Sequence, residues 1–188
     1  MIAGIVDLKL NNIFSIKNAA SQLGYVTKII TKPEDVNSCD ALILPGTGSF
    51  HKAMYRLNKD KLTYAIKTFI ENGKPFLGIC LGMQLLFSKS CEFVTTDGIG
   101  VLKGEVVNIK SFDKNLKVPH VGMNYLKLTK NQKKSKIDLF EKKKYFFNHS
   151  FAVHGEDDSM SMAYTNYDKF KFCSVIKKNN ILGTQFHP

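Results

Sequence analysis

Tryptophan is absent from this sequence of 188 residues, arginine occurs once, and no apolar run is long. A helix needs roughly 20 apolar residues to cross a membrane, and no stretch approaches that length, so we expect no membrane partner. The first apolar segment, Ile2–Val6, meets Asp7 at once, which argues against a signal peptide. Together these absences predict a cytoplasmic protein.

Cysteine is also scarce, with four residues that lie far apart: Cys39, Cys80, Cys91 and Cys173. They form no CxxC pair and have no adjacent histidine ligands. The sequence therefore predicts neither a metal site nor a disulfide framework.

The positive charge is almost entirely lysine. The formal net charge is +11 at pH 7, yet Arg56 is the only arginine. Bidentate recognition of bases and phosphates relies on arginine, so we expect no nucleic-acid partner. A basic nucleic-acid-binding module is the alternative that the charge motivates. The lysines crowd into 126–144, which we interpret as a solvated surface or a face for an acidic partner.

Strand and helix patterns alternate through the first half, in the way that builds a parallel sheet. After about Gly98 the pattern changes to short strands separated by turn residues. We therefore expect one α/β domain over residues 1–188, with a doubly wound sheet and an antiparallel-rich C-terminal half. The predicted first-half strands are Ile2–Val6, Tyr25–Ile30, Ala41–Leu44 and Pro75–Ile79, and the helices are Asn12–Leu23 and Leu62–Glu71. The later strands are Val101–Ile109, Lys117–His120, Tyr125–Leu128, Tyr145–Val153, Ser161–Tyr164, Phe172–Ile176 and Ile181–Phe186.

The segment Gly78-Ile79-Cys80-Leu81-Gly82 has the pattern of a nucleophile elbow, in which a strained turn between strand and helix carries the reactive side chain. Glycines on both sides let strand and helix pass closely. We expect the thiol to point into solvent and the helix Leu81–Ser88 to favour the thiolate through its N-terminus. The alternative is a buried structural cysteine on a core strand.

A cysteine nucleophile requires a base and donors for the oxyanion. Among the five histidines, His187 is the best candidate base, because it follows a predicted strand that ends at the same sheet edge. The Leu81 N–H and the loop 45–48 are candidate oxyanion donors, although a plain tight turn is the alternative for that loop. Gln84 lies one helical turn after Cys80, where its amide can reach a polar substrate or simply face solvent.

These motifs together resemble those of the class I (triad) glutamine amidotransferases. They occur in the family order and span nearly the whole chain. The matching segments are Leu44–Phe50, Gly78–Phe87, Val118–Asn124, Tyr145–Phe151 and Gly183–Pro188.

The resemblance implies a flavodoxin-like mixed sheet and the hydrolysis of L-glutamine to glutamate and ammonia, with no metal and no organic cofactor. It also implies a heterodimer, in which ammonia passes through a tunnel to a (β/α)₈-barrel cyclase partner in histidine biosynthesis. The implied site residues are Cys80 as nucleophile, His187 as proton carrier, Gly48 and Leu81 as oxyanion donors, and Gln84, His149, Ser150 and Phe151 around the substrate.

The sequence departs from the family pattern at four places. The family triad closes with a glutamate two residues after the histidine, whereas this sequence ends at Pro188, so we interpret it as truncated. The loop 7–12 lacks both family glycines, Met123 stands where the family has tryptophan, and Asn148 is an extra residue before the His-Ser pair. By resemblance the loop and Met123 meet the partner, so two alternatives stay open: an amidotransferase subunit for surface-polysaccharide sugar amination, and a non-catalytic pseudo-glutaminase scaffold.

Overall fold

A mixed sheet of eight strands forms the centre of the protein. The computed structural model describes residues 1–10, 13–129, 142–154 and 159–188. The parallel strands are β1 (Ile2–Val6), β2 (Val26–Ile30), β3 (Ala41–Gly46), β4 (Phe76–Cys80) and β14 (Ile181–Thr184). The antiparallel strands are β9 (Lys127–Leu128), β12 (Ser161–Tyr167) and β13 (Phe170–Lys178). The strand order is β2-β1-β3-β4-β14-β13-β12-β9, whose first five strands have the order of a doubly wound, flavodoxin-like sheet.

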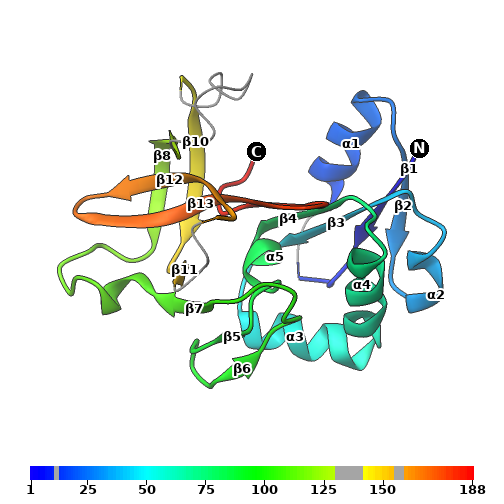
Figure 1. Cartoon of the computed structure of the whole chain (residues 1–188), viewed down its shortest axis with the longest axis horizontal. Coiled ribbons are helices and arrows are strands. Elements are labelled where there is room, and N and C mark those ends of the chain that lie inside the picture. Colours follow the sequence, from blue (N-terminus) through cyan, green and yellow to red (C-terminus); the bar gives the residue numbers. More distant parts are fainter. Residues whose placement is uncertain (11–12, 130–141, 155–158) are drawn as a thin grey trace.

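Helices flank the parallel part of this sheet. In Figure 1, α1 lies above β1 to β4, whereas α3 and α4 lie below them. None of the helices in the described ranges is long and apolar enough to span a membrane. The helices are α1 (Phe14–Gln22), α2 (Pro33–Val36), α3 (Phe50–Lys59), α4 (Leu62–Glu71) and α5 (Leu81–Gln84), with a 3₁₀ turn at Ile109–Ser111.

Two smaller sheets accompany the main one. The first is a two-stranded antiparallel ribbon of β8 (His120–Tyr125) and β10 (Lys144–His149). The second has the order β11-β7-β5-β6, with strands Phe151–His154, Glu105–Asn108, Lys89–Ser90 and Thr96–Asp97. Figure 1 shows these strands on the side of the molecule away from α1, α2 and α4. The predicted fold class, a doubly wound first half with an antiparallel-rich second half, is confirmed.

Two apolar clusters hold these layers together. The larger one packs the inner faces of α3, α4 and α5 against the parallel strands. The smaller one joins the ribbon to β12 and β13, and its large members are Phe147, Phe170, Phe172 and Phe186. The ribbon is thereby fixed against the main sheet, close to the end of β14.

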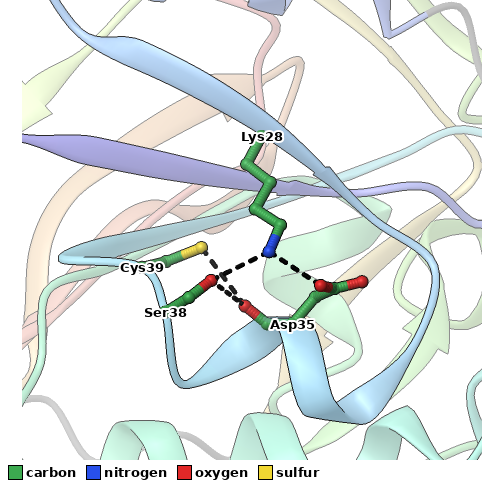
Figure 2. Close-up of polar contacts among 4 residues, drawn as sticks. All are labelled: Lys28, Asp35, Ser38 and Cys39. Carbon is green, nitrogen blue, oxygen red and sulfur yellow. Dashed lines mark hydrogen bonds and ion pairs between the residues drawn. The ribbon is translucent and has the colours of Figure 1, made fainter.

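A polar cluster ties β2 to α2 at the edge of the sheet that is remote from β14 (Figure 2). The Lys28 Nζ lies 2.7 Å from Asp35 Oδ1 and donates to Ser38 Oγ at 3.1 Å. The Asp35 carbonyl oxygen accepts from Ser38 Oγ at 2.7 Å and from Cys39 Sγ at 3.6 Å. Because the ion pair is partly exposed, we expect it to contribute less than about 1 kcal/mol.

Several predicted boundaries are wrong. The helix after Cys80 ends at Gln84 and not at Ser88, because the N–H groups of Leu86 and Phe87 bond three residues back. Helix α3 is missing from the sequence-based prediction, although Phe50, Ala53 and Leu57 form its buried face.

The strands of the second half also differ from their predicted ranges. The predicted strand Tyr145–Val153 is two strands in different sheets, separated at Ser150. Strand β8 fills the gap between the strands predicted at Lys117–His120 and Tyr125–Leu128 and shares one residue with each. Strand β9 confirms residues 127 and 128 of the second prediction, and only 105–108 of Val101–Ile109 is extended in a sheet. Most of the lysine-rich segment 126–144 lies outside the described residues.

Candidate active site

The candidate catalytic residues meet at the carboxyl ends of β3, β4 and β14, which are neighbours in the sheet. Gly46 on β3 pairs with Cys80 on β4, and Thr184 on β14 pairs with Ile79. The residues after Thr184 therefore continue alongside Cys80. Ligand sites of doubly wound sheets lie at such strand ends.

Cys80 has the backbone geometry of an elbow. Its φ is 54° and its ψ is −111°, a conformation that residues other than glycine rarely adopt. A Cβ on Gly82 would lie 1.7 Å from the Leu44 carbonyl oxygen, and one on Gly78 would lie 2.8 Å from the Gly82 carbonyl oxygen. Glycine at these two positions is what allows strand, turn and helix to pass so closely.

The expected exposure of the Cys80 thiol is wrong. The residue is only 5% exposed, and its burial raises the pKa of the thiol to about 11. Hydrogen bonds from the Leu81 N–H and the Gln185 side chain act in the opposite direction, but they are outweighed. Since α5 has a single turn, its N-terminus is a weaker source of stabilisation for a thiolate than the predicted longer helix.

His187 lies three residues beyond β14, at the same edge as Cys80. Its N–H donates to the Phe146 carbonyl oxygen at 3.0 Å, which joins it to the ribbon. Partial burial lowers the pKa of its imidazole, so the ring is neutral at pH 7 and able to accept a proton. Within the described ranges its ring forms no hydrogen bond with the Cys80 sulfur.

The loop after β3 lies directly against the elbow. A Cβ on Gly46, the last residue of β3, would lie 2.6 Å from the Leu81 Cβ. Gly48 in the loop has a φ of 95°, and no neighbouring atom lies within 4 Å of the position that its Cβ would take. The Glu92 carboxylate accepts from the Phe50 N–H at 2.6 Å and so fixes the start of α3 after the loop. Loop and elbow thus place the backbones of Gly48 and Leu81, the two candidate oxyanion donors, on one edge.

Gln84 and Gln185 form a buried amide pair beside Cys80. The Gln84 Nε2 donates to the Gln185 Oε1 and to the Phe151 carbonyl oxygen, each at 2.9 Å. The Gln185 Nε2 in turn lies 3.6 Å from the Cys80 sulfur. Both hydrogens of the Gln84 amide are therefore committed to the protein, so that only its oxygen remains to meet a substrate. Gln185 is the residue that sequence reasoning missed.

The segment of His149, Ser150 and Phe151 reaches the same amide pair from the ribbon side. The His149 Nδ1 lies 2.8 Å from the Phe151 carbonyl oxygen, and its Nε2 lies 3.0 Å from the Nδ1 of His120. Burial lowers the pKa of both imidazoles to about 4, so both are neutral at pH 7. The Ser150 carbonyl oxygen accepts from the Ile109 N–H at 3.0 Å. In the part of the chain that the structure describes, no three potential metal ligands cluster.

Known proteins resemble this chain along nearly its full length. Residues 5–188 match the family described as glutamine amidotransferase class-I. The imidazole glycerol phosphate synthase subunit HisH of Lactococcus lactis subsp. lactis is 41% identical over 184 residues, which cover 98% of this chain and 89% of that protein. The subunit of the same name from Halalkalibacterium halodurans is 40% identical over 188 residues, covering 98% and 87%. A crystal structure of a glutamine amidotransferase shares the fold, with a TM-score of 0.74 at 17% identity over 100% of this chain and 90% of that chain.

Proposed function

Because this chain belongs to the class I glutamine amidotransferase family, we propose that it is the glutaminase subunit of imidazole glycerol phosphate synthase, acting in histidine biosynthesis. It hydrolyses L-glutamine to glutamate and ammonia, and residues 1–188 act as one functional domain. Relatives of about 40% identity carry the name of that subunit, which favours this pathway over sugar amination.

The observation that carries the proposal is the strained backbone of Cys80 at the strand ends where His187 and the loop 45–48 also lie. The Cys80 sulfur attacks the side-chain amide carbon of glutamine while its proton passes to His187. The N–H groups of Gly48 and Leu81 stabilise the oxyanion that forms. The C–N bond then breaks as His187 returns the proton to the departing ammonia. Water hydrolyses the thioester, with the same imidazole as base and then as acid.

We expect a glutamine-analogue diazo-ketone to alkylate Cys80, and an excess of glutamine to protect it. Cys91 is exposed and serves as the internal control, because a general thiol reaction would modify it without glutamine protection. Intact mass and peptide mapping identify the modified residue. The same reaction on a chain extended past Pro188 by the family glutamate measures how much that residue adds. Unprotected labelling of Cys80, or no labelling of either chain, contradicts the proposed function.

The ribbon presents an apolar face that fits a protein partner. Strand β8 directs Val121, Met123 and Tyr125 outward, at exposures of 57%, 57% and 49%, and Phe146 lies opposite Met123 at 42%. Isolated apolar side chains are common on surfaces, but four on one two-stranded ribbon form a patch. The Phe146 carbonyl also accepts from the His187 N–H, so one hydrogen bond links this face to the backbone of the candidate base. We place the (β/α)₈-barrel cyclase subunit here, as the second member of a heterodimer.

Substituting Met123→Lys is expected to reduce activation by the cyclase subunit at least about tenfold, since a charge would be buried at the interface centre. In the resting chain the thiol is protonated and His187 does not contact it, so glutaminase activity without the partner should be slow. The assay follows ammonia release with and without the purified cyclase subunit. Tyr64→Lys on α4, where the side chain is 79% exposed, is the matched control. Equal loss in both variants, or full activity of the lone chain, contradicts the proposed interface.

A further inference from the structure

We propose, on the basis of the proposed function, that Gln185 is a further catalytic residue whose amide N–H stabilises the Cys80 thiolate, and that Gln84 is the positioning residue that orients this amide. Gln185 has no exposed surface, and Gln84 is 5% exposed. Both amides are therefore shielded from bulk water, and the hydrogen bonds of their NH₂ groups go to protein partners. Their contacts form one continuous chain from the Phe151 carbonyl to the Cys80 sulfur.

The direction of this chain follows from its first member. A backbone carbonyl oxygen can only accept, so the group that Gln84 turns towards Phe151 must be its NH₂. The second hydrogen of that NH₂ is then donated to the Gln185 oxygen. With its oxygen held by Gln84, Gln185 can present only its NH₂ to the sulfur 3.6 Å away. The backbone carbonyl of Phe151 in β11 thus determines that Gln185 turns a donor, and not an acceptor, towards Cys80.

The Phe151 carbonyl is itself held from the other side. It accepts from the His149 Nδ1 at 2.8 Å, so the His149 Nε2 has no proton and accepts from the His120 Nδ1. The two lone pairs of the carbonyl oxygen are thereby occupied by Gln84 and His149. With His149 on one side of this oxygen and Gln84 on the other, the Gln84 amide has a fixed orientation, and so has the Gln185 amide that it holds.

A donor at the sulfur matters because the thiol is buried. Burial penalises the charged thiolate, and hydrogen bonds to a charged acceptor are the stronger kind. The Leu81 N–H is the other donor to this sulfur, but it is also a candidate oxyanion donor. When the Leu81 N–H turns to a substrate oxygen, Gln185 is the donor that remains with Cys80.

The test measures the alkylation rate of Cys80 by iodoacetamide against pH, because that rate follows the thiolate fraction and needs no glutamine. Gln185→Met keeps the volume but removes the donor, so we expect alkylation at pH 8 to slow about tenfold and the profile to move up by about one pH unit. Gln84→Met should shift the profile in the same direction by a smaller amount. Peptide mapping assigns the rate to Cys80, and thermal melting verifies that each variant is folded.

The double variant separates this role from a structural one. Because Gln84 acts on the sulfur only through Gln185, the double variant should match Gln185→Met alone. Ser174→Ala is the control, and it should leave the profile unchanged. The Ser174 carbonyl accepts from the Gln185 N–H and is retained, whereas the buried hydroxyl that is removed bonds to Thr165. An unchanged profile in Gln185→Met, or additive shifts in the double variant, overturns the inference. If Gln185→Met does not fold, an unchanged profile in Gln84→Met overturns it. Loss of glutamine protection in wild type would refute the proposed function alone.

Discussion

Replacing Cys80 with serine is expected to reduce glutamine turnover by at least about 10⁴-fold, since the nucleophile is lost. A serine hydroxyl in this site has no close base in the resting chain, and its proton is far harder to remove than that of a thiol. The fold should be retained, because the oxygen can accept from the same Leu81 N–H and Gln185 donors. We expect the free energy of unfolding to change by less than about 1 kcal/mol.

The measurement compares ammonia release by wild type and Cys80→Ser in the presence of the cyclase subunit, together with binding of that subunit. Cys91→Ser is the matched control, because Cys91 is exposed and lies just after β5, outside the strands whose ends form the site. Unchanged binding with no turnover supports the nucleophile assignment. Ammonia release by Cys80→Ser within about a hundredfold of the wild-type rate would refute it, because removal of a nucleophile costs far more than that. Absence of turnover in both proteins would favour the pseudo-glutaminase scaffold.

Substituting Gly82→Ala is expected to cause the largest loss of stability of any single methyl addition near the site. The new Cβ would lie 1.7 Å from the Leu44 carbonyl oxygen, which belongs to a central strand and cannot rotate away. Strand β3 and helix α5 must separate, which disturbs the apolar cluster between them. We expect the free energy of unfolding to fall by about 3–5 kcal/mol.

Urea unfolding of the two proteins measures this difference, and Gly100→Ala provides the comparison. Gly100 has a φ of 71° but no neighbour within 4 Å of its added Cβ, so only backbone strain is expected, about 1–2 kcal/mol. A larger loss in Gly100→Ala than in Gly82→Ala would show that the close passage at the elbow is not what requires glycine. Equal losses would also contradict the prediction, because Gly82 lies in α5 without the positive φ that strains an alanine at position 100.

The sequence was sufficient to predict the elbow and the order of the layers, because both depend on local patterns. Gly78 and Gly82 flank Cys80 at the spacing that a close turn requires, and alternating apolar strands and helices identify a doubly wound sheet. Helix α4 was predicted with its observed bounds, since Ile66, Phe69 and Ile70 repeat at helical spacing. The failure on α5 is a boundary error, because the chain tightens into three-residue turns after Gln84. Helix α3 was missed altogether, although Phe50, Ala53 and Leu57 repeat at helical spacing.

The burial of Cys80 and the role of Gln185 could not be predicted, because both depend on contacts between distant segments. Gln84 lies 67 residues from Phe151 and 101 from Gln185, and their hydrogen bonds exist only after β4, β11 and β14 meet. No local pattern distinguishes a glutamine that faces a thiol from one that faces solvent. The sequence offered one indication of the role of Gln185. It precedes His187 by two positions, and residues two apart in an extended chain point to the same face.

The alternation along the ribbon separates two evolutionary pressures within one strand. On β8 the side chains at positions 121, 123 and 125 are exposed and belong to neither apolar cluster. By contrast, His120 on the same strand is buried and stacks on the buried ring of Phe147 from β10. Outward residues can therefore diverge together with a binding partner while the inward ones stay constrained by packing. Met123 is one of the outward residues, so a substitution at this position changes the exposed face of the ribbon and leaves the packing of the buried face unchanged.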